Sequence, residues 1–244
     1  MDLDGKTALI TGGAIRVGRA LTLALAEAGC NVFIHYGRSA APAQQTQADA
    51  RAFGVEAHIH SANLNDVSAT QSIIPAVIDR FGRVDVLINS AAIFPEEDTF
   101  TTSELSLWDE LFAINLRAPF LLSQAFAAQI PQDGQGKIIN VLDARLRRPA
   151  PDHFVYRLTK GGLWNMTEML AHELAPRIAV NAVALGAIMP PPGMDVSYLE
   201  GLTRTQVPLK RPGSPQIVAD NVLHLLRQDF LTGVIIPIDG GQFL

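Results

Sequence analysis

Short apolar runs alternate with longer segments of helical periodicity along the whole 244-residue chain. Seven runs have the length and composition of strands, at 6–11, 31–35, 55–60, 84–89, 137–142, 178–183 and 234–238. Segments with a helical pattern separate them, at 18–29, 42–53, 66–81, 105–130, 156–174 and 215–228. Strands and helices that alternate in this way are joined by crossovers, which build a parallel sheet. The pattern predicts a single α/β domain over residues 1–244, doubly wound and Rossmann-type, with about seven parallel strands and helices on both faces.

The composition of the chain excludes several classes of binding partner and indicates its cellular compartment. The formal net charge is −5, so the chain lacks the basic field of a nucleic-acid-binding protein. No continuous apolar segment reaches the ~18 residues of a membrane span, and no secretory signal is visible. A single cysteine, Cys30, suits a reducing compartment, and no histidine spacing suggests a metal site. We therefore expect a cytoplasmic protein that binds a small molecule and that binds neither nucleic acid, membrane nor metal.

A glycine-rich turn, TGGAIRVG at 11–18, lies between the first predicted strand and the first predicted helix. Glycines there let the backbone approach a pyrophosphate, whose charge is stabilised by the N-terminus of the following helix. The acidic residue that usually binds the adenosine ribose is missing after the second strand, where the chain reads HYGRS at 35–39. Arg38 suits a 2′-phosphate, and Arg16 could approach the same group from the turn. These residues predict NADPH as the cofactor in preference to NADH.

Tyr156 and Lys160 are one helical turn apart, and Asp143 precedes the tyrosine by thirteen residues. Residues i and i+4 face the same side of a helix, so the phenol and the ammonium lie together. A free phenol titrates near ~10, and a nearby cation favours its phenolate and brings it toward a useful range. The pair is therefore a candidate proton-transfer site.

In these motifs the chain resembles the short-chain dehydrogenase/reductase family over essentially its whole length. The matching pieces, in family order, are the 11–18 turn, Asn89-Ser90-Ala91, Asn115, Asp143 at the strand-five position, the Tyr156/Lys160 pair and Ile238-Asp239-Gly240-Gly241. The resemblance implies that Tyr156 donates a proton, that Lys160 lowers its pKa and holds the nicotinamide ribose, and that Asn115 supports a water beside Lys160. It also implies a homotetramer formed through the helices that carry Asn115 and Tyr156.

By the same resemblance, a larger set of residues is expected to bind the cofactor. It comprises Gly12, Arg16, Val17, Gly18, His35, Tyr36, Arg38, Ser39, Asn63, Leu64, Asn89, Ser90, Ala91, Tyr156, Lys160, Gly186 and Ile188. Two positions depart from the family pattern around this site. Asn63 stands where an aspartate usually contacts adenine, and Leu185-Gly186 replaces the usual Pro-Gly beside the nicotinamide.

Further departures resemble the pteridine reductases, NADPH-dependent enzymes that reduce biopterin- or folate-like rings. Arg16 replaces the central glycine of the turn, Asp143 replaces the usual catalytic serine, and Phe94 follows Asn89 by five residues. In that subfamily the arginine contacts NADPH, the aspartate works with the tyrosine in proton delivery, and the phenylalanine stacks on the pterin opposite the nicotinamide. A flat ring gains stacking from both faces of such a site. The implied substrate-binding residues are Arg16, Phe94, Asp143 and Tyr156.

Two other functions are alternatives, and the role of segment 186–205 also has two interpretations. A carbonyl reductase acting on an acyl-carrier-protein ketone, sugar or steroid is disfavoured because an ionised Asp143 would repel a developing alkoxide. A nucleotide-sensing binding protein is disfavoured by the intact Asn115, Tyr156 and Lys160. The Pro/Gly-dense stretch 186–193 leads into 198–205, and 186–205 is either a substrate loop, acting as a lid, or a plain connector.

Overall fold

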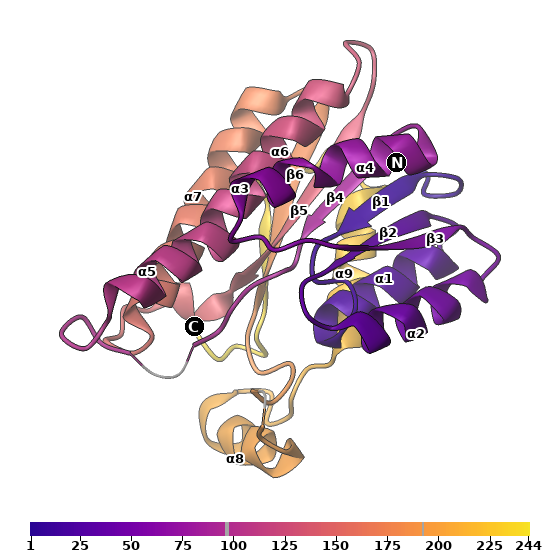
Figure 1. The fold of residues 1–244 in the computed structure, drawn as a ribbon. Coiled ribbons are helices and arrows are strands. Elements are labelled where there is room, and N and C mark those ends of the chain that lie inside the picture. Colours follow the sequence, from indigo (N-terminus) through magenta and orange to yellow (C-terminus); the bar gives the residue numbers. More distant parts are fainter. Residues whose placement is uncertain (96–97, 192) are drawn as a thin grey trace.

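The computed structural model describes residues 1–95, 98–191 and 193–244, so Pro192 of the predicted substrate loop lies outside the described residues. Its centre is a seven-stranded parallel sheet (Figure 1) of β1 (Thr7–Ile10), β2 (Asn31–Tyr36), β3 (Ala57–Ser61), β4 (Val86–Asn89), β5 (Gly136–Asp143), β6 (Ile178–Leu185) and β7 (Ile235–Ile238). The α-helices are α1 (Arg16–Glu27), α2 (Ala40–Arg51), α3 (Val67–Gln71), α4 (Ile73–Phe81), α5 (Leu105–Phe112), α6 (Ala118–Gln129), α7 (Phe154–Leu174), α8 (Val196–Gln206) and α9 (Pro215–Arg227). The predicted α/β class is confirmed.

The strand order is β3-β2-β1-β4-β5-β6-β7, with every neighbouring pair parallel. The chain therefore builds outward from β1 to β3 and then crosses back to place β4 on the other side of β1. At such a reversal the connections leaving the two central strands turn away from each other. This opens a crevice at their carboxyl ends, where ligands of open α/β sheets bind.

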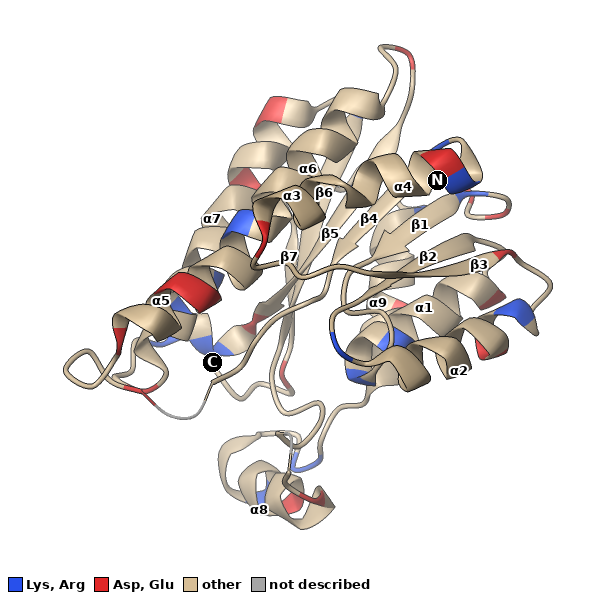
Figure 2. Cartoon of the chain, viewed as in Figure 1, with Lys and Arg blue, Asp and Glu red and all other residues tan. Residues whose placement is uncertain are grey.

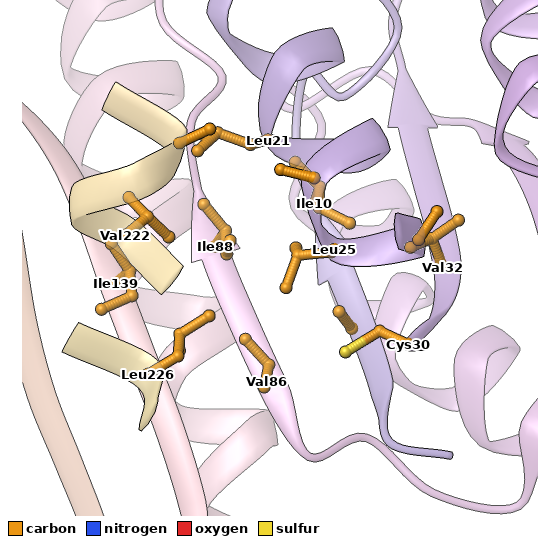
Figure 3. Packing of buried hydrophobic residues seen from close by; sticks show 14 of the residues in the cluster. Ile10, Leu21, Leu25, Cys30, Val32, Val86, Ile88, Ile139, Val222 and Leu226 are labelled. Atoms are coloured by element: carbon orange, nitrogen blue, oxygen red, sulfur yellow. The ribbon is translucent and has the colours of Figure 1, made fainter. Parts of the chain in front are cut away.

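Each face of the sheet is covered by its own layer of helices (Figure 1). Successive strand residues point to opposite faces, so Ile10 and Ile34 pack into one core cluster while Leu9 and Phe33 pack into the other. The first cluster, seen in Figure 3, joins the sheet to α1 and α9 through residues such as Leu21, Leu25, Val222 and Leu226. Burial on both faces explains why several strands, such as β1 and β4, are almost continuously apolar.

Two predicted helices contain interruptions that their periodicity did not indicate. The predicted helix 66–81 is two helices, α3 and α4, which meet at Ser72. Pro75 in the first turn of α4 has no N–H, so the backbone cannot continue its hydrogen bonding there. The predicted helix 105–130 contains a π-helical turn, η1 (Ala113–Arg117), between α5 and α6. Residues Leu105–Gln129 are long and apolar enough to cross a membrane by length and composition, and 44% of their most apolar window is buried in the protein, so this single segment is weak evidence for a membrane span.

An additional helix, α8, occupies the second half of the predicted substrate loop and projects from the body of the protein (Figure 1). Asp195 caps it, because its carboxylate accepts hydrogen bonds from the backbone N–H groups of Ser197 and Tyr198. Figure 2 shows that charged residues concentrate on helices and loops, with few on the strands.

Candidate active site

A cleft of about 730 Å³ lies at the carboxyl ends of β1, β2 and β4. Most of the residues predicted to bind the cofactor line it: Gly12, Arg16, Val17, Gly18, His35, Tyr36, Arg38, Ser39, Asn63, Leu64, Ser90 and Ala91. Leu185, which stands in the place of the family's proline, is also part of its wall. The fold therefore collects into one concavity residues that are far apart in the sequence.

The glycines of the 11–18 turn are required by close backbone approaches. A Cβ added to Gly18 would lie 2.1 Å from the carbonyl oxygen of Gly12, and one added to Gly12 would lie 3.0 Å from the Cα of Ala91. The turn can therefore present its backbone to a ligand only with glycine at these positions. The first turn of α1 follows directly, and this supplies N–H donors suited to a pyrophosphate.

Arg16 stands in the same turn with a left-handed backbone, at φ 54°. Glycine adopts this conformation without steric cost, which gives a physical reason for glycine as the usual residue. The Arg16 side chain reaches the predicted substrate loop, where its guanidinium donates a hydrogen bond of 2.6 Å to the carbonyl of Pro190. Arg16 thus links the cofactor cleft to the 186–205 segment.

His35 supports the glycine turn from within the sheet. Its Nδ1 accepts a hydrogen bond of 3.3 Å from the N–H of Gly12, and its Nε2 lies 3.0 Å from the carbonyl of Ala62. Because Nδ1 accepts and Nε2 must donate, the two contacts select one neutral tautomer. Burial lowers the pKa of His35 to about 4, which keeps the ring neutral at physiological pH. His35 therefore holds the glycine turn in place on the side of the sheet, where the turn lines the cleft.

Arg38 and Ser39 lie where β2 ends and α2 begins. Arg38 is exposed and lines the cleft, and Ser39 is the N-cap residue of α2 without a capping hydrogen bond from its side chain. A guanidinium, a hydroxyl and the N-terminus of a helix therefore lie together at one side of the cleft. This combination suits a phosphate.

Tyr156, Lys160 and Asp143 meet beside the cleft, next to Val141, which is part of its wall. The Tyr156 hydroxyl donates to Asp143 Oδ2 at 3.2 Å, and Lys160 Nζ donates to the carbonyl of Val141 at 2.8 Å. The aspartate ends β5, and its Oδ1 accepts a hydrogen bond of 2.9 Å from the backbone N–H of Arg145, which fixes the carboxylate orientation. The predicted trio is thus brought together in space.

Burial and charge set the ionisation of this trio. The expectation that the pKa of Tyr156 is lowered by Lys160 is not met: burial, and then the negative charge of Asp143, raise this pKa well above its usual value, while Arg145 and Arg157 act in the opposite direction. The pKa of Lys160 is lowered to about 8, chiefly by burial, against which Asp143 acts. The ammonium is therefore the main form at neutral pH and is lost as the pH rises above about 8.

Asn115 lies in the π-helical turn and is completely buried. Its side-chain amide exchanges two hydrogen bonds with the backbone of Ile93, of 2.9 and 3.0 Å, and contacts the Thr159 hydroxyl at 3.4 Å. π-Turns inside α-helices occur frequently at functional sites. Here the turn holds the segment before Phe94 against the helix that carries Tyr156.

Phe94 lies beside Tyr156, with ring centroids 5.0 Å apart in an edge-to-face arrangement. The His153 ring is also close to Phe94, with ring centroids 4.5 Å apart, and Arg145 is a further neighbour that the sequence did not indicate. The Arg145 guanidinium lies 4.9 Å from the centre of the Phe94 ring and 5.9 Å from that of Tyr156. Arg145 belongs to η2 (Ala144–Arg147), a 3₁₀-helix that sequence periodicity did not indicate. The only available signal was its place two residues after Asp143.

Five predicted cofactor residues are not among those that line the cleft: Tyr156 and Lys160, which lie beside it, and Asn89, Gly186 and Ile188. The Asn89 amide group points inward to Asn140, at 2.9 Å, and to Ser123. Ile188 is buried in the core cluster beside α1 and α9, and Gly186 packs so closely on Asp239 that an added Cβ would lie 2.6 Å from its Cβ. Among the described residues, no group of three His, Cys, Asp or Glu side chains could hold a metal ion.

Comparison with known proteins adds independent information on the whole chain. A family model described as enoyl-(acyl carrier protein) reductase matches residues 13–242. The chain is 33% identical over 243 residues to 3-oxoacyl-(acyl-carrier-protein) reductase FabG of Staphylococcus aureus, covering 98% of both chains. The structure of FolM alternative dihydrofolate reductase 1 from Brucella canis, complexed with NADP, superimposes with a TM-score of 0.92 at 32% identity, over 100% of this chain and 96% of that one. A short-chain dehydrogenase from Burkholderia cenocepacia, also in complex with NADP, gives 0.91 at 30% identity, over 100% of both chains.

Proposed function

The chain belongs to the short-chain dehydrogenase/reductase family, and on this basis we propose that it is an NADPH-dependent reductase of a pterin or dihydropterin/dihydrofolate-type ring. Membership makes it an NAD(P)-dependent oxidoreductase with the Tyr156 and Lys160 pair in place. The observation that carries the substrate proposal is the cluster of Phe94, Asp143 and Tyr156 beside the cofactor cleft.

NADPH fits the cleft on three grounds. The close-packed glycine turn leaves backbone space for a pyrophosphate. Arg38 and Ser39 supply cationic and hydroxyl donors where an acidic residue would repel a 2′-phosphate. Two structural relatives over the full length of the chain were solved with NADP.

The cofactor preference is testable through Arg38. A hydrogen bond from a charged group is worth about 1.5–3 kcal/mol, so NADPH should be preferred over NADH by at least ~10-fold in kcat/KM. Arg38→Ala should remove most of this preference by raising the KM for NADPH. NADH is the internal control, because it has no 2′-phosphate and its KM should hardly change. Equal use of both cofactors by the wild-type protein would contradict the assignment.

The residues of the site divide the chemistry between them. When bound, NADPH would supply the hydride for a carbon of the substrate ring. Tyr156 supplies the proton to the adjacent nitrogen, and the phenolate that remains is stabilised by the positive charge of Lys160. Asp143 accepts a hydrogen bond from the tyrosine and holds it in place. The phenolate then recovers a proton from solvent.

Two features favour a pterin over a simple ketone. Phe94 is a partly solvent-exposed aromatic ring next to the proton donor, against which a flat heterocycle would stack. Asp143 replaces the neutral hydroxyl that would bind a ketone oxygen, and its charge opposes a developing alkoxide. The likeness to the FolM structure supports the same substrate class.

Phe94→Ala tests this substrate class. Stacking of a heterocycle on an aromatic side chain is worth about 1–3 kcal/mol, so the KM for dihydropterins should rise by ~5- to 150-fold. NADPH affinity should stay nearly unchanged. Phe100→Ala is the matched control, because Phe100 lies in the same connection and is largely exposed. An unchanged KM for dihydropterins would remove Phe94 from the substrate site.

The second candidate function is a 3-oxoacyl or other carbonyl reductase. It is favoured by the match to the family model and by the FabG relatives, whose printed activity is of this kind. A panel of dihydrobiopterin, dihydrofolate, a 3-oxoacyl thioester and simple ketones separates the two. A strong preference for the thioester or ketones over every pterin would replace the proposal above.

The 186–205 segment and the oligomer complete the proposal. The segment would act as the substrate loop, since Arg16 holds it to the cofactor turn.

A homotetramer is supported by apolar side chains exposed on α5, α6 and α7, namely Leu105, Trp108, Phe120 and Met169. A bacterial cytoplasm suits the relationship to FabG and the buried free thiol of Cys30.

A further inference from the structure

Arg145 occupies a central place in the cluster around Tyr156. Its Nε lies 3.0 Å from Asp143 Oδ2, and its Nη1 lies 3.7 Å from Asp152 Oδ2. The first contact is an ion pair without a hydrogen bond, because Nε is buried and has no hydrogen-bond partner among the described residues. Both side chains of the Arg145–Asp143 pair are mostly buried, so solvent screens their interaction only in part.

The aspartate creates an electrostatic problem for proton donation by Tyr156. A carboxylate 3.2 Å from the phenol oxygen opposes formation of the phenolate. A serine at this position would add no charge. An enzyme that keeps Asp143 here therefore needs positive charge close to the pair.

Lys160 supplies only part of this positive charge. Its ammonium donates to the carbonyl of Val141, and burial lowers its pKa to about 8. Arg145 supplies a second cation, its guanidinium. It is in direct contact with Asp143 and lies 5.9 Å from the centre of the Tyr156 ring. Figure 2 shows Lys and Arg gathered at this end of α7.

Arg145 also joins the carboxylate to the aromatic wall of the site. Its guanidinium lies 4.9 Å from the centre of the Phe94 ring, within the range of a cation–π contact. Its backbone N–H donates to the other oxygen of Asp143. One residue thus contacts both oxygens of the carboxylate and the phenylalanine ring.

We propose that Arg145 is a positioning residue, which forms with Asp143 an ion-paired unit in the place of the family's serine. Arg145 offsets the charge of Asp143 so that Tyr156 can release its proton, and it fixes the Phe94 ring against which the substrate binds. The inference rests on the proposed reductase function, because it concerns the proton-transfer step of that reaction.

A double-mutant cycle tests the proposal, with Arg145→Met, Asp143→Ser and the double variant. Loss of an opposite charge at this distance changes the proton-transfer equilibrium by ~10-fold or more, so Arg145→Met should lower kcat by at least that factor. The same change made in the Asp143→Ser background should cost less than ~2-fold, because no carboxylate charge remains to be offset. Arg145→Lys should recover part of the loss. NADPH affinity, measured by fluorescence titration, should stay the same in all variants.

Arg147→Met is the matched control, because Arg147 lies in the same 3₁₀-helix and is exposed. It should leave kcat and thermal stability unchanged. Equal losses from Arg145→Met in both backgrounds would overturn the proposal, since Arg145 would then act independently of Asp143. A fall in melting temperature and NADPH affinity that accounts for the lost activity would also overturn it, by making the role structural.

The cycle is run on the substrate that the wild-type protein reduces fastest, which separates two kinds of failure. A wild-type protein that reduces ketones and no pterin would remove the pterin assignment, while coupling between Arg145 and Asp143 would still be measured. A wild-type protein that reduces pterins without such coupling would overturn the role of Arg145 alone.

Discussion

Tyr156→Phe should lower turnover by ~10²–10⁴, the usual contribution of a positioned general acid. The substitution keeps the ring, and with it the edge-to-face contact to Phe94, but removes the hydroxyl that donates to Asp143. Steady-state kcat with NADPH and a dihydropterin is the measurement. The proton must otherwise come from bulk solvent, which is not oriented toward the substrate nitrogen.

The binding of NADPH is the control for this variant. The glycine turn and Arg38 are remote from the phenol, so NADPH should still bind to Tyr156→Phe with nearly normal affinity. Near-normal turnover by the variant would show that another group delivers the proton, and the mechanism proposed here would be wrong.

Lys160→Met should lower kcat by about 10²-fold or more, because it removes a buried cation one helical turn from the tyrosine. If the ammonium also holds the nicotinamide ribose, the affinity for NADPH should fall as well, which distinguishes this variant from Tyr156→Phe. Lys6→Met, at the start of the sheet, is the control for loss of a lysine charge. Unchanged NADPH affinity would limit the role of Lys160 to the proton-transfer step.

The pH dependence follows from the same residue. Burial lowers the pKa of Lys160 to about 8, so its charge is present below that pH and is lost above it. The charged form is the one that favours the phenolate, and kcat/KM for NADPH should therefore decrease as the pH rises through about 8. Lys160→Met should lack this decrease. A wild-type profile that stays level well above pH 8 would show that the charge of Lys160 is not required.

Local sequence patterns were sufficient to predict the features that depend on the spacing of residues along the chain. All seven strands were predicted from their apolar runs, and the parallel arrangement followed from the helices between them. Tyr156 and Lys160 were identified because a helix of fixed pitch aligns residues four apart. The glycine turn was identified because its position between β1 and α1 is itself a feature of sequence order.

Features that depend on contacts between distant segments could not be predicted in this way. The helical pattern of 105–130 gave no sign of the π-turn, whose Asn115 bonds to the backbone of Ile93. Asn89 was expected at the cofactor, and yet its amide is held inside the sheet by Asn140. The cap of α8 by Asp195 was readable in principle, but the proline-rich stretch before it suggested a loop.

The succession of strands and helices, the nucleotide-type turn and the chemical groups available for proton transfer could all be predicted from local sequence, because each is encoded in residues close together in the chain. The electrostatics of the site, in contrast, arise only in the folded protein. Arg145 follows Asp143 by two residues in every conformation, but only the 3₁₀-turn after β5 puts its guanidinium against both that carboxylate and Phe94. The ionisation of Tyr156 and Lys160 depends in the same way on burial and on charges brought together by packing, which the order of residues does not specify.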